Sequence, residues 1–198
     1  MFETIKRWIF GRPPPPRDFI TRLTPVSQFE VEVNDLGLFL ISSAVFISSK
    51  TEVTADRLTW SLRRLMAIHP LLRMRVGVHD GQWWWREMAE LEPDVRVDTS
   101  RDWHEAFSRN TDETYDIVNG PLWRVTLLPD VTSEYCDVPE LLRHHCCLVM
   151  GFNHAIIDGT GKLHHAVILF SLSLSCTRTY MYTYVHANTN NRHVRSYM

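Results

Sequence analysis

The chain has 198 residues, with 21 lysines and arginines against 23 aspartates and glutamates, and 44% of its residues are hydrophobic. The formal net charge of −2 excludes electrostatic binding of nucleic acid as its main activity, because neutralising phosphates requires a basic face. The apolar stretches at 36–47 and 165–176 are interrupted by serines and fall short of the roughly 18 residues that a membrane span requires. The first residues lack the apolar core of a secretory signal, and four cysteines without a CxxC spacing fit a reducing compartment, so we expect a cytoplasmic protein.

The N-terminal segment, 1–19, is marked by consecutive prolines at 13–16. Proline fixes φ and makes the chain stiff and extended, which is typical of a linker leading into a domain. An SH3-type ligand is the alternative interpretation of this proline run.

Two strands are predicted next. Apolar and acidic residues alternate over 26–33, which indicates a strand with one solvated face. A turn at 34–37 follows, and the largely apolar run at 38–47 predicts a buried strand. We expect these two strands to pair or to lie side by side.

The spacing of the apolar residues then changes to that of a helix. Apolar residues at 54–68 recur at i, i+4, i+7 and i+8, with Thr54 as a candidate N-cap, and predict an amphipathic helix that Pro70 ends. The runs 71–78 and 83–88 flank an Asp-Gly turn and predict a β-hairpin. Its second strand opens with three tryptophans, for which packing is favoured over a ligand-stacking platform because neighbours on a strand face opposite sides.

The remaining predicted elements are a short helix at 102–109, strands at 122–128 and 146–153, and a helix at 160–169. Strands interleaved with helices, without a strict βαβ repeat, predict an α/β or α+β domain: a two-layer sandwich of a mixed sheet with helices. Neither GxGxxG nor GxxxxGK[ST] occurs, so a dinucleotide or P-loop site has no support.

Composition changes sharply near residue 170. Residues 171–198 contain no Gly, Pro, Trp, Asp or Glu, and 15 of the 28 are Ser, Thr, Asn or Tyr. The preceding part of the chain carries a net charge of −5, whereas this tail carries +3. We therefore divide the chain into the proline-rich segment 1–19, a domain at 20–170, and an atypical tail at 171–198. We expect the tail to be disordered or to be an extension unrelated to the domain.

The sharpest chemical feature is the segment GFNHAIIDG at 151–159. An apolar strand delivers His154 at its end, and Asp158 follows four residues later, beside Gly159. A histidine can accept and return a proton near neutral pH, so His154 is a candidate general base, with a purely structural histidine as the alternative.

Metal binding is the rival interpretation of this region. A serine nucleophile has no support, because the GxSxG elbow does not occur. For a metal, none of the usual zinc spacings occurs, and adjacent side chains on a strand diverge. We therefore expect no metal site. The residues of ligand type in this region are His144, His145, Cys146, Cys147, His154, Asp158, His164 and His165.

The segment 154–159 matches an HxxxDG motif and resembles the chloramphenicol-acetyltransferase-like acyltransferases, a superfamily that includes peptide-synthetase condensation domains and alcohol acetyltransferases. Two further segments carry the resemblance, in the same order as in the family. Residues 58–73 look like its helix that ends in HPxLR, and residues 115–128 look like its strand with the gPLwR sequence. The chain is thus similar to the N-terminal half of such an enzyme.

The resemblance implies transfer of an acyl group from a thioester, on coenzyme A or a carrier protein, to a hydroxyl or amine. His154 would be the general base, Asp158 a structural residue paired with an arginine, and Gly159 the residue that leaves room beside the histidine. Asn153 stands where condensation domains commonly carry a second histidine. This difference favours alcohol-acyltransferase-like members, and Asn153 is a candidate for the substrate channel. We expect acyl-CoA as a co-substrate, a small alcohol as acceptor, and no tightly bound cofactor.

Members of this superfamily are longer, with a second half and a tunnel between the halves. We therefore expect the chain by itself to be incomplete and to show little or no turnover, because orientation of the reactants can lower the barrier by roughly 7–11 kcal/mol. Two alternatives stay open. One is condensation-type formation of an amide or ester from carrier-protein thioesters, and the other is an inactive fragment or binding module that exposes the surface of the missing C-terminal half.

Overall fold

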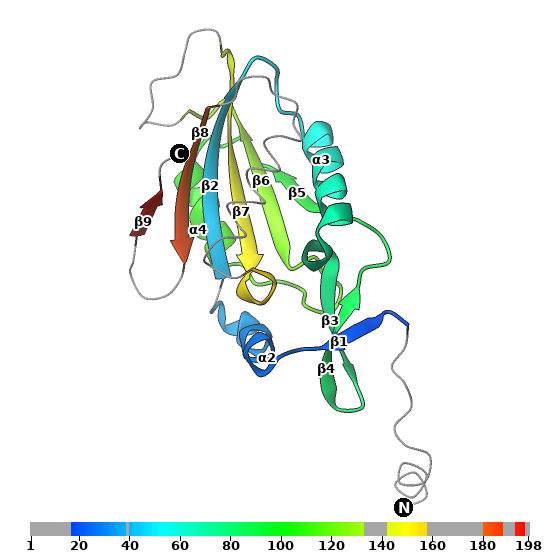
Figure 1. Cartoon of the computed structure of the whole chain (residues 1–198). Coiled ribbons are helices and arrows are strands. Elements are labelled where there is room, and N and C mark those ends of the chain that lie inside the picture. Colours follow the sequence, from blue (N-terminus) through cyan, green and yellow to red (C-terminus); the bar gives the residue numbers. More distant parts are fainter. Residues whose placement is uncertain (1–16, 39, 133–141, 158–179, 188–192, 197–198) are drawn as a thin grey trace, which may run out of the picture.

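The computed structural model describes residues 17–38, 40–132 and 142–157, together with the backbone of two later strands. The helix predicted at 160–169 lies outside the described residues. In chain order (Figure 1), the elements are β1 (Phe19–Arg22), α2 (Pro25–Glu32), η1 (Asn34–Leu36), β2 (Leu40–Ser49), α3 (Ala55–Ile68), η2 (Pro70–Arg73), β3 (Met74–His79), β4 (Gln82–Glu87), β5 (Asp94–Val97), α4 (Trp103–Asp112), β6 (Trp123–Pro129), β7 (His144–Asn153), η3 (His154–Ile156), β8 (Tyr180–Ala187) and β9 (His193–Ser196).

The strands form two sheets. The larger has the order β5-β6-β7-β2-β8-β9, in which β5 runs parallel to β6 and the other neighbours are antiparallel. The smaller sheet, β1-β4-β3, is antiparallel throughout. The predicted α+β fold built on a mixed sheet is confirmed. Within the described part of the chain, no helix is long and apolar enough to cross a membrane.

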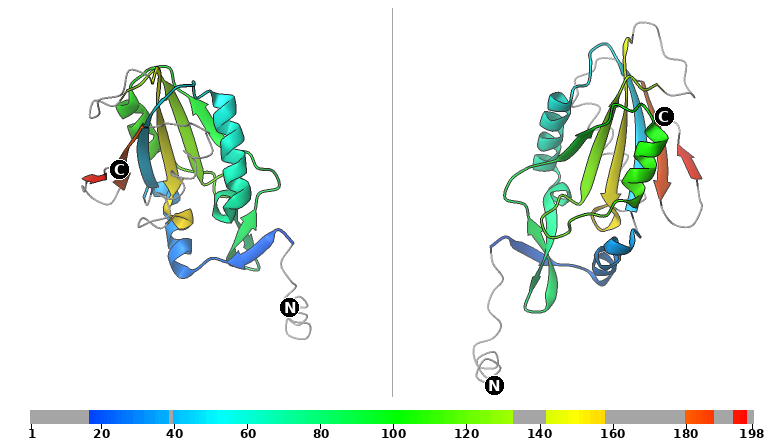
Figure 2. Two further views of the ribbon diagram at one scale, coloured as in Figure 1. Left: turned by 45° about the horizontal axis from the view of Figure 1, so that its top comes forward. Right: turned by 180° about the vertical axis from the view of Figure 1, so that it is seen from behind.

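Helices cover both faces of the larger sheet (Figure 2). Because side chains alternate along a strand, β2 contributes to two separate cores. Val45 belongs to the core that contains Leu58 of α3, whereas Phe46 packs edge-on against Trp103 of α4, with ring centroids 5.2 Å apart. The central strands β2 and β7 are consequently buried along most of their length.

Several predicted elements are confirmed. Helix α3 begins after Thr54, whose hydroxyl accepts a hydrogen bond from Arg57 N, and its apolar stripe is buried. Strands β3 and β4 form the predicted hairpin. Of the three tryptophans, Trp85 is buried in the core on the α3 side, whereas Trp84 lies on the other face of β4, under the guanidinium of Arg22.

The strand predicted at 26–33 is wrong, because these residues form helix α2. The alternating pattern treats Phe29 as a buried residue and Glu30 as a solvated one. In the structure Phe29 is 52% exposed and Glu30 is 8% exposed, which is the opposite. The predicted pairing of this segment with β2 is wrong for the same reason, since β2 pairs with β7 and β8.

Local capping explains why a helix forms here. The hydroxyl of Thr24 accepts a hydrogen bond from Ser27 N at 3.1 Å, and Pro25 occupies the first helical position, where its fixed φ suits the helix. Gly37 adopts a left-handed conformation, with φ of 66°, where the following turn ends. These signals at the start and after the end of the segment favour a helix more strongly than the alternation of apolar and acidic residues over 26–33 favours a strand.

Part of the tail contributes backbone to the larger sheet. Strand β8 pairs antiparallel with β2 from Ser48 to Ile41, and β9 pairs with β8. The expectation that 171–198 is disordered or unrelated to the domain stays a prediction. The division of the chain into three segments stays a prediction.

Helix α3 supplies a test of the fold. Leu58 is completely buried against the sheet, so Leu58→Ala should lower the free energy of unfolding by about 2–5 kcal/mol. Trp60 lies on the exposed side of the same helix, under Arg64, and Trp60→Ala should cost about 1 kcal/mol or less. Urea denaturation would measure both, and equal losses would contradict this orientation of α3.

Candidate functional site

His154 lies at the point where the central strand β7 leaves the sheet. β7 pairs with β2 and β6 on its two sides up to Asn153 and Phe152, and His154 begins the short turn η3 directly afterwards. This is the strand-end position that the sequence predicts. The side chain of His154 is 28% exposed, so part of the ring is within reach of a bound molecule.

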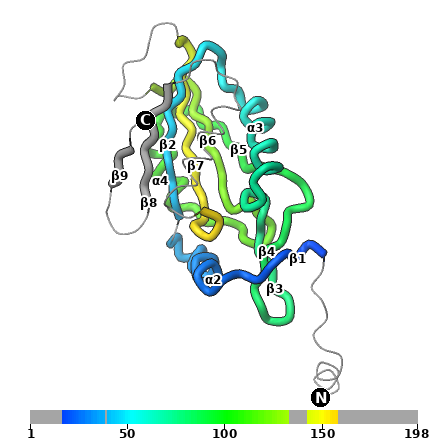
Figure 3. Tube along the Cα trace, in the orientation of Figure 1, coloured from blue at the N-terminus to red at the C-terminus, as the bar shows by residue number. Residues whose placement is uncertain are grey.

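Glu30 of α2 lies against this histidine. One carboxylate oxygen, Oε1, is 2.7 Å from Nδ1 of His154. Burying a carboxylate is costly unless it is hydrogen-bonded, and His154 provides this bond. Helix α2 and turn η3 lie side by side at one end of the larger sheet (Figure 3).

Sequence reasoning missed Glu30 because it placed this residue on the solvated face of a strand. The sequence does contain a signal for a helix here: Thr24 is an N-cap, and Pro25 follows it at the first helical position. Even a correctly predicted helix would not have brought Glu30 to His154, because that contact depends on how the chain returns through the sheet.

Two buried asparagines hold the same region together. Asn153 accepts a hydrogen bond from Ala155 N at 3.0 Å through Oδ1 and donates to Oδ1 of Asn34 at 3.2 Å through Nδ2. Asn34 in turn binds the backbone of Tyr115, donating to its carbonyl at 2.9 Å and accepting from its N–H at 3.2 Å. The amide of Asn153 therefore holds η3 and η1 in place. That this residue also lines a substrate channel stays a prediction.

The rest of the predicted motif, Asp158 and Gly159, lies outside the described residues, as do His164 and His165. Among the residues that are described, no three His, Cys, Asp or Glu side chains are grouped as a metal ion would need.

Cys146 and Cys147 face the two different cores, as adjacent residues on a strand must. Burial raises the pKa of the Cys147 thiol far above its usual range.

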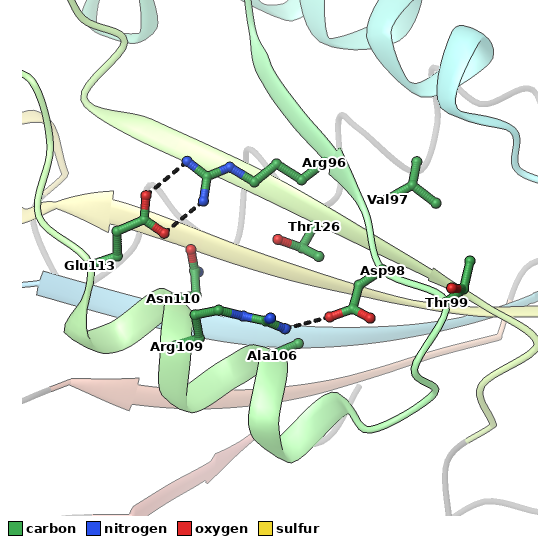
Figure 4. A pocket seen from close by; sticks show the side chains of 9 residues that line it. All are labelled: Arg96, Val97, Asp98, Thr99, Ala106, Arg109, Asn110, Glu113 and Thr126. Carbon is green, nitrogen blue, oxygen red and sulfur yellow. Dashed lines mark hydrogen bonds and ion pairs between the residues drawn. The ribbon is translucent and has the colours of Figure 1, made fainter.

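A second polar cluster lies between α4 and strands β5 and β6 (Figure 4). It surrounds a pocket of about 360 Å³ whose lining does not include His154. Arg96 donates to both carboxylate oxygens of Glu113, at 2.6 and 2.9 Å, and also binds Asp94, while Arg109 binds Asp98. The hydrogen bond from Arg96 lowers the pKa of the Glu113 carboxyl. Because each of these charges has a partner of opposite sign, the cluster serves to attach α4 to the sheet.

Comparison with solved structures identifies proteins that share this fold. No family model and no curated protein matches the chain. Among solved structures, the starter condensation domain of rhizomide synthetase RzmA matches with a TM-score of 0.59 and 15% identity, over 78% of this chain and 37% of that chain. The tallysomycin biosynthesis protein TlmII also matches with a TM-score of 0.59, at 17% identity, over 80% of this chain and 39% of that chain.

A mutant of the RzmA domain in complex with C8-CoA matches as well, with a TM-score of 0.58 and 14% identity, over 77% of this chain and 34% of that chain. The chain thus has the fold of the N-terminal subdomain of condensation domains and spans little more than a third of their length. The fold expected from the resemblance is confirmed, because condensation domains share it.

The asparagine pair can be tested by mutation. Asn34→Ala removes partners from the backbone of Tyr115 and from Nδ2 of Asn153, all of them buried. Each buried polar group left without a partner costs about 1–3 kcal/mol, so the variant should lose at least that much stability. Asp35→Ala is the control. It removes only an exposed carboxylate that accepts from Nδ2 of Asn34 at 3.1 Å, so it should lose much less. Urea denaturation compares the two, and a similar loss in both would contradict the role given to Asn34.

The Glu113 cluster predicts a pH dependence. The pKa of Glu113 in the folded protein lies below its ordinary value of 4.5, so its contribution to stability is present above 4.5 and is lost as pH falls through the folded pKa. Glu113→Gln removes this contribution. The difference in unfolding free energy between wild type and variant should be largest near neutral pH and should shrink in acid. A difference that stays constant or grows as pH falls would contradict the prediction.

Proposed function

We propose, from a fold shared with the N-terminal subdomain of condensation domains, that this protein is of the acyltransferase type. In this proposal His154 is the general base for transfer of an acyl group from acyl-CoA to the hydroxyl of a small alcohol. The observation that carries the proposal is the place of His154: a partly exposed imidazole, held through Nδ1, at the end of the central strand of this fold.

The proposed reaction proceeds by direct attack of the acceptor on the thioester. The imidazole takes the proton from the alcohol as the alcohol oxygen forms a bond to the thioester carbonyl carbon. The C–S bond of the resulting tetrahedral species then breaks, and the imidazolium returns the proton to the departing thiolate. The products are an ester and the free thiol of coenzyme A, and the histidine is regenerated. Proton transfer by a positioned base contributes about 10²–10⁴-fold to such a rate.

Acyl-CoA is the proposed donor because a relative in fold, the RzmA starter condensation domain, was crystallised in complex with C8-CoA. A second candidate is the condensation-type reaction, in which a carrier protein presents the acyl thioester and the product is an amide or ester. The condensation-domain fold of the same relative supports it. Asparagine rather than a second histidine at position 153 supports the alcohol acceptor.

The remaining motif residues have proposed roles as well. Asp158 would keep the loop in shape through an arginine, Gly159 would leave room for the thiol arm of the donor, and Asn153 would lie beside the substrate channel. Because the chain spans little more than a third of its relatives in fold, we propose that the second wall of this channel comes from a surface equivalent to their C-terminal half.

A mass-spectrometric assay tests the function. The chain is incubated with octanoyl-CoA or with an octanoyl carrier protein, in the presence of an alcohol or an amine. We expect slow ester formation from octanoyl-CoA, because the chain spans little more than a third of its relatives in fold, and loss of this product in His154→Ala.

His144→Ala is the matched control, because this histidine is exposed at the far end of the same strand. Product from the carrier protein alone would favour the condensation-type reaction. Product formed equally by wild type and His154→Ala, or by neither, would contradict the proposed role of His154.

A further inference from the structure

The partner of His154 is a buried carboxylate from a helix far away in the sequence. Resting on the function proposed above, we propose that Glu30 is a positioning residue. It holds His154 in the tautomer that carries its proton on Nδ1, so that Nε2 is the nitrogen that takes the proton from the acceptor and returns it to the thiolate.

Hydrogen-bond chemistry decides the tautomer. An ionised carboxylate can only accept hydrogen bonds, so the 2.7 Å contact with Oε1 of Glu30 requires a proton on Nδ1 of His154. A neutral imidazole carries a single ring proton, and its lone pair then lies on Nε2. The contact therefore selects which of the two ring nitrogens is basic.

The same contact stabilises the charge that forms during the reaction. When Nε2 takes a proton, His154 becomes an imidazolium with the Glu30 carboxylate 2.7 Å from its other nitrogen. Glu30 is 8% exposed, and opposite charges attract more strongly away from water than at the surface. A base oriented by a third group is the arrangement on which nucleophile-activating sites in enzymes depend.

The composition of α2 also points to a role for Glu30 beyond packing. The helix buries Glu30 and Val31, whereas two of its apolar side chains, Val26 and Phe29, are exposed. A helix selected only to cover the core would bury the apolar residues and expose the carboxylate. Here the packing face of the helix presents a carboxylate to an imidazole.

The surroundings hold this carboxylate in position. Thr24 caps the start of α2, and Asn34, just after its end, is hydrogen-bonded to Asn153, the residue before His154. The Glu30 contact and the bond between Asn34 and Asn153 therefore both join the α2–η1 segment to the end of β7. Precise positioning of a base needs such support from the residues around it.

Nuclear magnetic resonance of the full chain with ¹⁵N-labelled histidine tests the proposal without any substrate. The ring nitrogen shifts report whether the proton is on Nδ1 or Nε2, and His154→Ala assigns the signals. In the wild type at a pH where the ring is neutral, we expect the Nδ1–H form. Glu30→Gln should change the ratio of the two tautomers about tenfold or more, which is the effect of one charge-assisted hydrogen bond.

Glu32→Gln is the matched control, because Glu32 lies on the exposed side of the same helix and binds Gln28 instead. It should leave the His154 signals unchanged. In the ester assay, Glu30→Gln should lower kcat about tenfold or more with little change in KM, and Glu30→Asp should restore part of the loss.

A ring that carries its proton on Nε2 in the wild type would overturn the proposal. This is the form expected if Glu30 were protonated and donated a hydrogen bond to Nδ1. An unchanged tautomer ratio in Glu30→Gln would overturn it too. The wild-type spectrum decides the question even where the variant fails to fold. Because the tautomer is measured without turnover, a chain with the Nδ1–H ring that forms no ester would disprove the proposed function while leaving Glu30 as the residue that positions the ring.

Discussion

The antiparallel pairing of β2 with β7 is the constraint on which the rest of the structure depends. The two strands pair over ten residues, from Leu40 opposite Asn153 to Ser49 opposite His144. Because they run in opposite directions, the segment that enters β2 and the segment that leaves β7 meet at the same end of the sheet. Helix α2 enters there and His154 leaves there, so this register is what brings Glu30 to the histidine.

Packing on both faces fixes the end of β7 that carries the histidine. On one face Phe152 stacks on Trp123, with ring centroids 6.4 Å apart. On the other face Gly151 lies so close to α4 that a Cβ atom would be 2.5 Å from Nδ2 of Asn110. A glycine is therefore required at this position for α4 to approach the strand. Close packing on both sides limits the movement of the backbone that presents His154.

Local signals explain which elements could be predicted. Helix α3 is predictable because its N-cap and its apolar stripe agree, and the hairpin is predictable because an Asp-Gly pair suits a tight turn. Segment 26–33 misleads because its alternation gives Phe29 to the core and Glu30 to solvent. The capping signal at Thr24-Pro25 is the stronger one, since it satisfies backbone groups that alternation does not affect.

The sequence by itself determined His154 as the candidate base, the helices and strands with strong local signals, and the segments that carry the family resemblance. These follow from residue types and short spacings, which act along the chain. Only the tertiary structure decided that Glu30 faces the imidazole and that Asn34 holds Asn153. The physical reason is that both contacts join segments far apart in sequence, and they form only after the strands between those segments have paired in register.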